Sequence, residues 1–465
     1  MFTGEDFYLA LEKTDNTNVM PVIPDIKCFS PKEGDLMRGR DPVAVAKELE
    51  RAGAPVLSVV TEETEFHGSL EILKNICDTV SVPVLRKDFV KSRDDLVETV
   101  EAGASAILLM YSCLGRQSLH EFYQEALQLG LLPFVETHNK EEMMWAQELG
   151  AKLIGINNRD IIQLERDDGT ICLTRELLKD APEGSLIISE SSIQNAEQIR
   201  QVIREGAYGA LVGTTILKED SVFEAYRRMI SKTGVKICGL TKPEDVVMCA
   251  RLGVDLAGVV VEYPVDVPWN QTVSQAKELL CKTKKEIKTS DIRIVMVTGG
   301  DFEKVTNLVE QCRPDIVQLH YTETFEESSA IARALAEDGI PVIRSIPLKA
   351  HDREKMFGTS DWKTIFDLIQ NSEIAAILLD SRQAENAAKG GGSIGDRVDI
   401  LDLAQILQTL TKPVILGGGI TADNVRGIRE ALHPDYIDVL TGVEKQPGDK
   451  SASKISELLE KVRGY

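Results

Sequence analysis

The chain has 465 residues, of which 43% are hydrophobic and 27% are charged. Length alone favours two or three domains, because a single hydrophobic core rarely grows beyond roughly 300 residues. The 74 acidic residues outnumber the 53 basic ones and leave a net charge of −21, with no basic run of the kind that nucleic acid requires. The sequence therefore argues against a nucleic-acid partner, and any anionic ligand must be bound by local devices such as helix N-termini and single lysines.

The first residues give no signal for export or for a membrane. The segment MFTGEDFYLALEKTDN has neither a basic start nor an apolar core, and no window approaches the roughly 20 apolar residues of a membrane span. The eight cysteines are scattered, without a Cys-x-x-C pair or a histidine at metal-ligand spacing. We therefore expect a cytoplasmic chain with reduced thiols, no membrane partner and no metal.

Short aliphatic runs alternate with amphipathic stretches in the first half, which is typical of βα units around a parallel sheet. Four predicted helices end in a glycine that can adopt a left-handed C-cap: Gly53, Gly103, Gly150 and Gly206. The strands are expected to begin near Val22, Pro55, Val82, Ser105, Pro133, Leu153, Leu186 and Gly209. Eight such units in roughly 230 residues indicate a TIM barrel.

The second half repeats this organisation after a short polar connector. It opens with Val235–Thr241, where Thr241 is expected to cap a helix that begins at Pro243. Its strands are expected to begin near Val235, Leu256, Ile292, Asp315, Pro341, Ile374, Pro413 and Tyr436. The predicted fold is α/β, with two consecutive TIM (β/α)8 barrels at residues 1–232 and 233–465.

Ionisable side chains occupy the strand ends of the first half, where a TIM barrel places its chemistry. The main candidates are Asp25, Lys27, Lys87, Glu136 and Glu190. One charged strand end is more often only solvated, but two lysines facing two carboxylates across one mouth can shift each other's pKa for acid/base work. Four residues in the loops after the seventh and eighth strands lie where barrels often bind phosphate: Ser191, Ser192, Gly213 and Thr214.

Six motifs follow one another on these strands: IKCFSPKEG, VLRKDF, VET, IGINNRD, ISES and LVGT. In residues and order they resemble indole-3-glycerol phosphate synthase over about residues 21–218. The resemblance implies a reaction without a cofactor. A carboxyphenylamino-deoxyribulose phosphate undergoes ring closure and decarboxylation and becomes indole-3-glycerol phosphate.

The resemblance also implies roles for single residues. Lys87 is similar to the general acid that protonates the leaving oxygen, Glu136 to the catalytic carboxylate of the fifth strand, and Lys27 to the lysine that engages the substrate carboxylate. Further catalytic residues would be Asp25, Asn157 and Glu190, and the substrate- or phosphate-binding residues would be Ser30, Arg159, Ser191, Ser192, Gly213 and Thr214. Asp25 replaces the glutamate of the family, and Ser192 replaces its glycine.

A thiol and a carboxylate stand out among the strand ends of the second half. A cysteine there is more often a small buried hydrophobe, but Cys238 on the first strand would face Asp380 on the sixth, as a base/acid pair. Gly417–Gly419 and the following Thr421–Asn424 favour phosphate binding, because glycines let backbone amides approach a ligand. Gly390–Gly395 is either a flexible loop or a substrate lid.

A second set of motifs resembles phosphoribosylanthranilate isomerase over about residues 236–465: KICGLTKPED, VQLH, LLDS, GGGSIGD, LGGGITADNV and DVLTGVEKQPGDK. The resemblance implies an Amadori rearrangement, in which Cys238 takes the C2 proton and Asp380 opens the ribose ring. The implied ligand-binding residues are Gln318, His320, Arg344, Gly418, Gly419, Thr441 and Gly442.

The second half departs from the isomerase pattern at several positions. Trp269 stands where the family has the arginine that meets the anthranilate carboxylate, and Arg344 is the candidate replacement cation. The other departures are Leu440 in place of a serine, Val398–Ile400 in place of Phe-Asp-Trp, and a longer loop at Arg382–Lys389.

Together the resemblances predict a monomeric bifunctional enzyme that acts on small phosphorylated substrates in two consecutive steps of tryptophan synthesis. Two alternatives stay open. The second barrel could be a degenerate domain that stabilises its neighbour or binds a partner, which Trp269 allows and the pair Cys238 and Asp380 opposes. Both barrels could also act on a related phosphorylated sugar amine, because fold alone does not choose the ligand.

Overall fold

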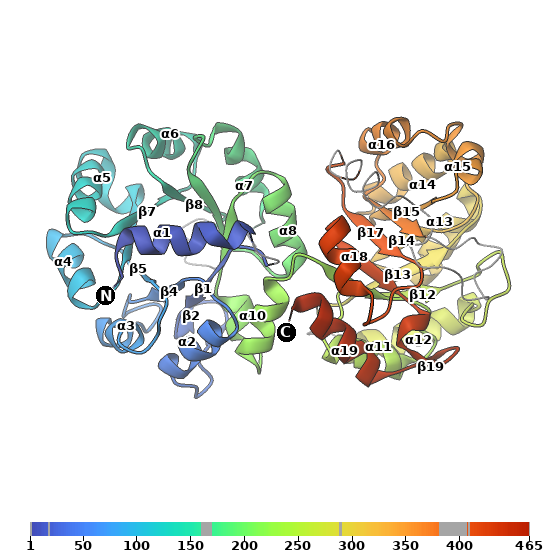
Figure 1. Ribbon diagram of the computed structural model, residues 1–465, viewed down its shortest axis with the longest axis horizontal. Helices are drawn as coiled ribbons and strands as arrows, with labels where there is room; N and C mark the ends of the chain where they lie inside the picture. The colour runs from blue at the N-terminus through green and yellow to red at the C-terminus, as the bar shows by residue number, and fades with distance from the viewer. Residues whose placement is uncertain are drawn as a thin grey trace. The chain divides into compact units, whose positions relative to one another are not determined.

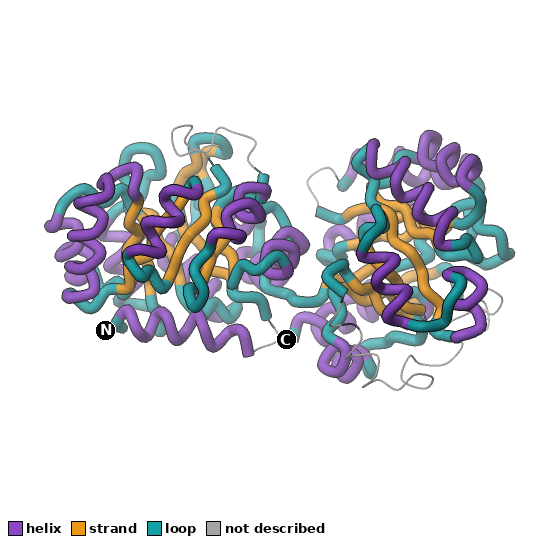
Figure 2. Tube along the Cα trace, turned by 90° about the horizontal axis from the view of Figure 1, so that it is seen from above, coloured by secondary structure: helices purple, strands orange, loops and turns teal. Residues whose placement is uncertain are grey.

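The computed structural model describes residues 2–16, 19–159, 170–287, 291–380, 407 and 410–464. The chain forms two compact units, Met1–Lys232 and Thr233–Tyr465. Each unit contains a closed barrel of eight parallel strands inside a layer of helices (Figures 1 and 2). The predicted fold of two consecutive TIM barrels is confirmed.

The strands of the first barrel close in the order β1-β10-β9-β8-β7-β6-β5-β4. Their bounds are β1 (Val22–Ile26), β4 (Leu57–Val60), β5 (Val84–Lys87), β6 (Ala106–Met110), β7 (Leu132–Thr137), β8 (Leu153–Asn157), β9 (Leu186–Glu190) and β10 (Gly209–Val212). A short hairpin, β2 (Phe29–Ser30) and β3 (Gly34–Asp35), follows β1. Every barrel strand begins within two residues of its expected position.

The helices of the first unit are α1 (Gly4–Glu12), α2 (Pro42–Arg51), α3 (Leu70–Cys77), α4 (Arg93–Glu101), α5 (Tyr111–Gln128), α6 (Lys140–Glu148), α7 (Cys172–Leu177), α8 (Ala196–Arg204), α9 (Thr214–Leu217) and α10 (Val222–Met229). Polar N-caps start several of them, as Ser92 does for α4 and Asn139 for α6. The glycines expected after α2, α4, α6 and α8 have φ between 67° and 112°. The predicted left-handed helix ends are thus confirmed.

Helix α1 covers the N-terminal end of the first barrel. Its Phe7 and Leu11 are fully buried and pack against residues at the strand starts, including Ile23 and Leu132. Gly4 lies so close to β7 that a Cβ would come 2.3 Å from the amide nitrogen of Leu132. The opposite end, where the strands finish, is the end that carries the site.

The second barrel closes in sequence order from β11 to β18. Its strands are β11 (Gly234–Ile237), β12 (Leu256–Val260), β13 (Arg293–Thr298), β14 (Ile316–Leu319), β15 (Val342–Pro347), β16 (Ala376–Asp380), β17 (Val414–Gly417) and β18 (Tyr436–Val439), followed by a hairpin of β19 (Glu444–Gln446) and β20 (Asp449–Lys450). Its described helices are α11 (Pro243–Arg251), α12 (Val273–Glu286), α13 (Phe302–Cys312), α14 (Phe325–Glu337), α15 (Ala350–Phe357), α16 (Trp362–Gln370), α18 (Val425–Leu432) and α19 (Ala452–Arg463). The expected cap of α11 is wrong: Lys242, not Thr241, is the N-cap, and its side chain makes no capping hydrogen bond.

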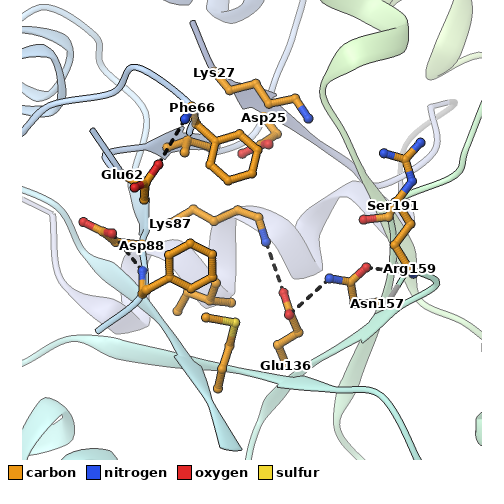
Figure 3. Close-up of a pocket in the computed structure, with 14 residues that line it drawn as sticks. Asp25, Lys27, Glu62, Phe66, Lys87, Asp88, Glu136, Asn157, Arg159 and Ser191 are labelled. Atoms are coloured by element: carbon orange, nitrogen blue, oxygen red, sulfur yellow. Dashed lines mark hydrogen bonds and ion pairs between the residues drawn. The ribbon is translucent and has the colours of Figure 1, made fainter. Parts of the chain in front are cut away.

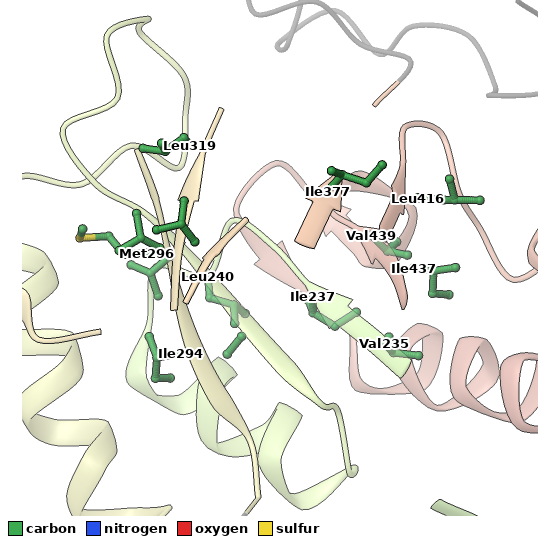
Figure 4. Packing of buried hydrophobic residues seen from close by; sticks show 14 of the residues in the cluster. Val235, Ile237, Leu240, Ile294, Met296, Leu319, Ile377, Leu416, Ile437 and Val439 are labelled. Atoms are coloured by element: carbon green, nitrogen blue, oxygen red, sulfur yellow. The ribbon is translucent and has the colours of Figure 1, made fainter. Parts of the chain in front are cut away.

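The strands of the second barrel are apolar on both faces, as expected where helices cover the outside and side chains fill the inside. Figure 4 shows the outer layer, in which Val235, Ile237 and Val439 belong to one buried cluster with the helices. Ile343 and Leu378 belong to a separate cluster that fills the interior. Residues two apart along a strand therefore share a face, and this decides which polar side chains reach the interior.

No helix among the described residues is long and apolar enough to cross a membrane.

Two candidate active sites

A partly buried lysine between two buried carboxylates forms the centre of the site in the first barrel. Phe134 lies on the inward face of β7, and Glu136, two residues later, shares that face. The same alternation brings Lys87 inward at the end of β5 and Glu190 at the end of β9. Lys87 Nζ donates to Glu136 Oε2 at 3.2 Å and to Glu190 Oε2 at 2.8 Å.

The two carboxylates of this cluster differ in their other contacts. Asn157 Nδ2 donates to Glu136 Oε1 at 3.1 Å, and Figure 3 shows Lys87 and Asn157 converging on Glu136. Glu190 Oε1 has no hydrogen-bond partner among the described residues. It occupies the space above Gly155, where a Cβ would lie 1.9 Å away. Glu136 is thus better supplied with donors than Glu190.

This asymmetry separates the acidities of the two groups. Burial raises the pKa of Glu136, but the Lys87 ammonium and the neighbouring His138 outweigh burial and bring the pKa to about 2. Burial raises the pKa of Glu190 to about 7. The negative charge of Glu136 adds to this rise, and the positive charge of Lys87 opposes it. Burial alone would lower the pKa of Lys87, but both carboxylates hold it above its usual value. At neutral pH the cluster therefore holds one ionised carboxylate, one ammonium and one group poised to exchange a proton.

Lys87, Glu136 and Asn157 line a pocket of about 640 Å³ that is open to solvent. Asp25 and Lys27 line it from the end of β1. Lys27 Nζ lies 5.8 Å from the centre of the Phe66 ring, and Ser58 donates to Asp25 Oδ1 at 2.6 Å. Five apolar side chains that the sequence did not single out also line the pocket: Val60, Phe66, Phe89, Leu108 and Met110. Cations beside an apolar wall suit an anionic substrate that carries an aromatic ring.

The expected phosphate-binding residues lie in the loops next to this pocket. Ser191 and Ser192 have φ of 63° and 60°, a left-handed backbone that is costly without glycine. Arg159 Nε donates to Ser192 Oγ at 3.4 Å, and Arg159 and Ser191 line the pocket. Gly213 precedes α9, which begins at Thr214, and a Cβ at Gly213 would lie 2.9 Å from the Asp25 carbonyl oxygen. Ser30 is buried in the β2–β3 hairpin.

The second barrel places a thiol beside an ion pair. Cys238 follows β11 and is buried, with its Sγ against Gly258, where a Cβ would lie 2.8 Å away. Lys236, two residues earlier on the same inward face, is fully buried and donates to Asp438 Oδ2 at 2.7 Å. Burial raises the pKa of Cys238, and the Lys236 ammonium opposes this rise. The sequence reasoning missed Lys236 and Asp438, although their positions on neighbouring strands β11 and β18 are in register.

Asp380 ends β16 and is buried on the same inner rim. His320 Nε2 lies 3.8 Å from its Oδ2, and the Nδ1 of His320 pairs with Gln318 Nε2 at 3.0 Å. A Cβ at Gly417 would lie 3.6 Å from Asp438 Cβ and 3.7 Å from Asp380 Oδ2, so the two acids flank this glycine. The structure therefore brings the expected acid close to the Lys236 and Asp438 pair beside Cys238.

The two expected phosphate loops of the second barrel are adjacent. Gly418 and Gly419 have φ of 95° and 67°, and the next residue is Ile420. A Cβ at Gly442 would lie 2.1 Å from the Ile420 carbonyl oxygen, so only glycine fits there. Thr441 starts the short helix η6 (Thr441–Val443) in which Gly442 lies.

The expectation for Arg344 is wrong. Its side chain is fully buried on the face of β15 that Val342 and Ile346 share with the helices, not on the inner face. Nη1 lies 2.7 Å from Glu323 Oε2, and Nη2 donates to the Glu323 carbonyl oxygen at 2.5 Å. The guanidinium is thus bound within the scaffold and is not available to a substrate carboxylate.

Trp269 is buried in the interior cluster together with Leu440. Both side chains pack over Gly239, where a Cβ would lie 3.1 Å from Leu440 Cγ and 3.3 Å from Trp269 Cγ. The two departures from the isomerase pattern therefore form one apolar wall next to Cys238. The other predictions for this barrel, at Gly390–Gly395, Val398–Ile400 and Arg382–Lys389, lie outside the described residues.

Within the described ranges, no group of three or more His, Cys, Asp or Glu residues is arranged to hold a metal ion.

The fold and the two sites define a double TIM-barrel enzyme with a separate acid/base constellation in each barrel. The family model for indole-3-glycerol phosphate synthase matches residues 2–229, and the model for N-(5'-phosphoribosyl)anthranilate isomerase matches residues 235–461. The chain belongs to the indole-3-glycerol phosphate synthase family, and with its isomerase domain it is a bifunctional enzyme of tryptophan biosynthesis.

Individual relatives cover either one half or nearly the whole chain. The indole-3-glycerol phosphate synthase of Pyrococcus furiosus is 40% identical over 210 residues, which is 45% of this chain and 91% of that protein. A multifunctional tryptophan biosynthesis protein of Phycomyces blakesleeanus is 27% identical over 497 residues and covers 95% of this chain and 62% of its own length. A solved phosphoribosyl anthranilate isomerase of Thermus thermophilus is 26% identical and covers 50% of this chain and 99% of its own, with a TM-score of 0.38.

Proposed function

We propose that the second barrel supplies the substrate of the first. The second barrel isomerises N-(5'-phosphoribosyl)anthranilate, with Cys238 as the base and Asp380 as the acid. The first barrel cyclises and decarboxylates the product to indole-3-glycerol phosphate, with Lys87 as the acid and Glu136 as the base.

The placement of Lys87 between Glu136 and Glu190 carries the assignment for the first barrel. Loss of a hydroxyl from the substrate needs a proton donor at the departing oxygen, and the ring that forms must give up a proton to a base. Lys87 stays an ammonium because both carboxylates raise its pKa, and Glu136 stays ionised. Lys27 lines the pocket beside Phe66, and this supports the proposal that it meets the substrate carboxylate next to the aromatic ring.

In the second barrel, the Lys236 ammonium next to Cys238 supports the role of a base. A thiolate is the active form of a cysteine base, and a nearby cation favours it against the cost of burial. Asp380 lies across Gly417 from Asp438, and in this proposal it protonates the ring oxygen of the ribose.

Two variants separate the proposed activities within one chain. Lys87→Met should lower synthase turnover by about 10² to 10⁴ and leave the isomerase unchanged, and Asp380→Asn should do the reverse. Steady-state assays of both reactions, and growth of auxotrophs that lack one activity, measure this. A parallel loss of both rates in either variant would contradict the assignment of one site to each barrel.

A further inference from the structure

His138 connects the catalytic carboxylate Glu136 to a second carboxylate behind the site. It lies two residues after Glu136, just past the end of β7, and its ring lies between two acids. Its Nε2 is 3.2 Å from Glu136 Oε1, an ion-pair contact without hydrogen-bond alignment, and its Nδ1 forms a 3.2 Å hydrogen bond with Glu142 Oε2. A neutral imidazole has only one N–H, so two facing carboxylates favour the doubly protonated ring.

Glu142 is itself held in place by the start of α6. The backbone N–H of His138 donates to Glu142 Oε2 at 2.8 Å, and Asn139 Nδ2 donates to Oε1 at 2.9 Å. Asn139 also caps α6 by accepting from the Glu142 N–H at 3.0 Å. The carboxylate of Glu142 is therefore fixed by the helix cap, and it fixes the ring of His138 in turn.

We propose that His138, held by Glu142, is a positioning residue of the synthase that keeps the Glu136 carboxylate ionised and aimed into the pocket. The exchangeable proton of the cluster then resides on Glu190. This inference rests on the proposed synthase function of the first barrel. It goes beyond that function because neither His138 nor Glu142 lines the pocket with Lys87 and Glu136.

The charges around His138 and Glu136 agree with the proposed positioning role of His138. Burial would lower the pKa of His138, but Glu136 and Glu142 raise it to about 10, so the ring is a cation at neutral pH. Among the described residues, other groups that interact electrostatically with Glu136 or Glu190 include Lys87 on β5, Asp25 on β1 and Cys113 in α5. Of these, only Lys87 is a cation, and Glu136 and Glu190 share it. His138 therefore gives Glu136 a second cationic neighbour that Glu190 lacks among these groups. The neutral side chain of Asn157 adds a hydrogen bond to Glu136.

The first test needs no substrate. The full chain contains six histidines, and 13C-labelled histidine with His138→Gln as the assignment variant identifies the His138 signal by NMR. The expected titration midpoint is above pH 8.5, and Glu142→Gln should lower it by about one pH unit or more. A midpoint near 6.5 in the unaltered chain would overturn the proposal.

The second test is the pH profile of the synthase. Without the His138 charge the pKa of Glu136 rises, so the proton that resides on Glu190 near neutral pH moves partly to the base. His138→Gln should lower synthase kcat about tenfold or more at pH 6, with little change in KM and with recovery toward the unaltered rate at pH 9. An equal loss at every pH would mean that His138 only supports the fold, and this would refute the proposal.

Lys140→Met is the matched control, because it removes an exposed cation from α6, the helix that contains Glu142. Lys140 pairs with Asp180 at 2.8 Å. It should leave both the profile and the His138 titration unchanged. Isomerase activity and urea unfolding of each variant report whether the chain is folded. A wild-type chain without synthase activity would refute the proposed function, whereas the NMR midpoint would still decide whether His138 is a fixed cation.

Discussion

Replacing Arg344 by methionine should destabilise the second barrel instead of weakening substrate binding. Arg344 and the Glu323 side chain are both buried, and their 2.7 Å ion pair lies between β15 and the segment that follows β14. After the change, the Glu323 carboxylate still accepts a 2.8 Å hydrogen bond from the Gly300 N–H, but it loses its only charged partner among the described residues. The carbonyl oxygens of Leu319 and Glu323 lose donors as well.

Removing one partner of a buried pair typically costs about 3–5 kcal/mol, because the other charge stays buried and unpaired. With a urea slope of about 2.5 kcal/mol per molar, the unfolding midpoint of the isomerase barrel should fall by about 1–2 M. Isomerase and synthase activities measured along the urea titration report on each barrel, and only the isomerase midpoint should move.

Two further variants test the reasoning about Arg344. Combining Arg344→Met with Glu323→Gln removes the unpaired charge and should recover part of the lost stability. Arg426→Met breaks an exposed pair with Glu430 and should cost less than about 0.5 kcal/mol. An Arg344→Met chain with an unchanged urea midpoint and a tenfold higher isomerase KM would refute the structural role and restore Arg344 as a substrate ligand.

Three other outcomes are expected. Gly155→Ala should lower synthase kcat by about 100-fold with an unchanged isomerase, because its Cβ would lie 1.9 Å from Glu190 Oε1; normal synthase kinetics would contradict this. Trp269→Arg should lower the isomerase KM by roughly tenfold, since a charge-assisted hydrogen bond to a carboxylate is worth about 1.5–3 kcal/mol; an unchanged KM would show that the carboxylate is bound elsewhere. As the pH rises from 6.5 to 10, the urea midpoint of the first barrel should decrease. The pKa of His138 is raised from 6.5 to about 10, so in this range the folded state holds a proton that the unfolded state releases. An equal decrease in His138→Gln would count against this origin.

Most of the fold could be predicted from the sequence because its signals are local. Each aliphatic run is short, and glycines such as Gly103 and Gly206 mark helix ends through a backbone angle that other residues avoid. The positions of Lys87, Glu136 and Glu190 followed from one rule, that chemistry in a TIM barrel lies where strands end. The contacts among them confirm only that these three residues meet, and their catalytic roles stay a prediction.

The error at Arg344 has a physical cause. Strands of a parallel barrel are apolar on both faces, so the alternation of Val342, Arg344 and Ile346 does not say whether that face points inward or toward the helices. For Lys236 the sequence did hold the answer, because it lies two residues before Cys238 and must share its face. His138 could also have been found, since its spacing of four residues from Glu142 at the start of a helix brings the two side chains together.

Each barrel has a lysine paired with a carboxylate at its inner rim, and the partners of that lysine set the charge around it. Lys87 bridges two carboxylates, so its charge is overcompensated, its pKa is raised, and one of the two acids must hold the extra proton near neutral pH. Among the described residues, Lys236 forms an ion pair with one carboxylate, Asp438, and lies beside the Cys238 thiol, so this ion pair is balanced in charge until Cys238 ionises. A second anion next to Lys236 would repeat the situation of the first barrel, and the Cys238 thiol supplies it only when it is ionised to the thiolate. In the reactions proposed for the two barrels, the first cluster would therefore donate and redistribute a proton, and the second would accept one.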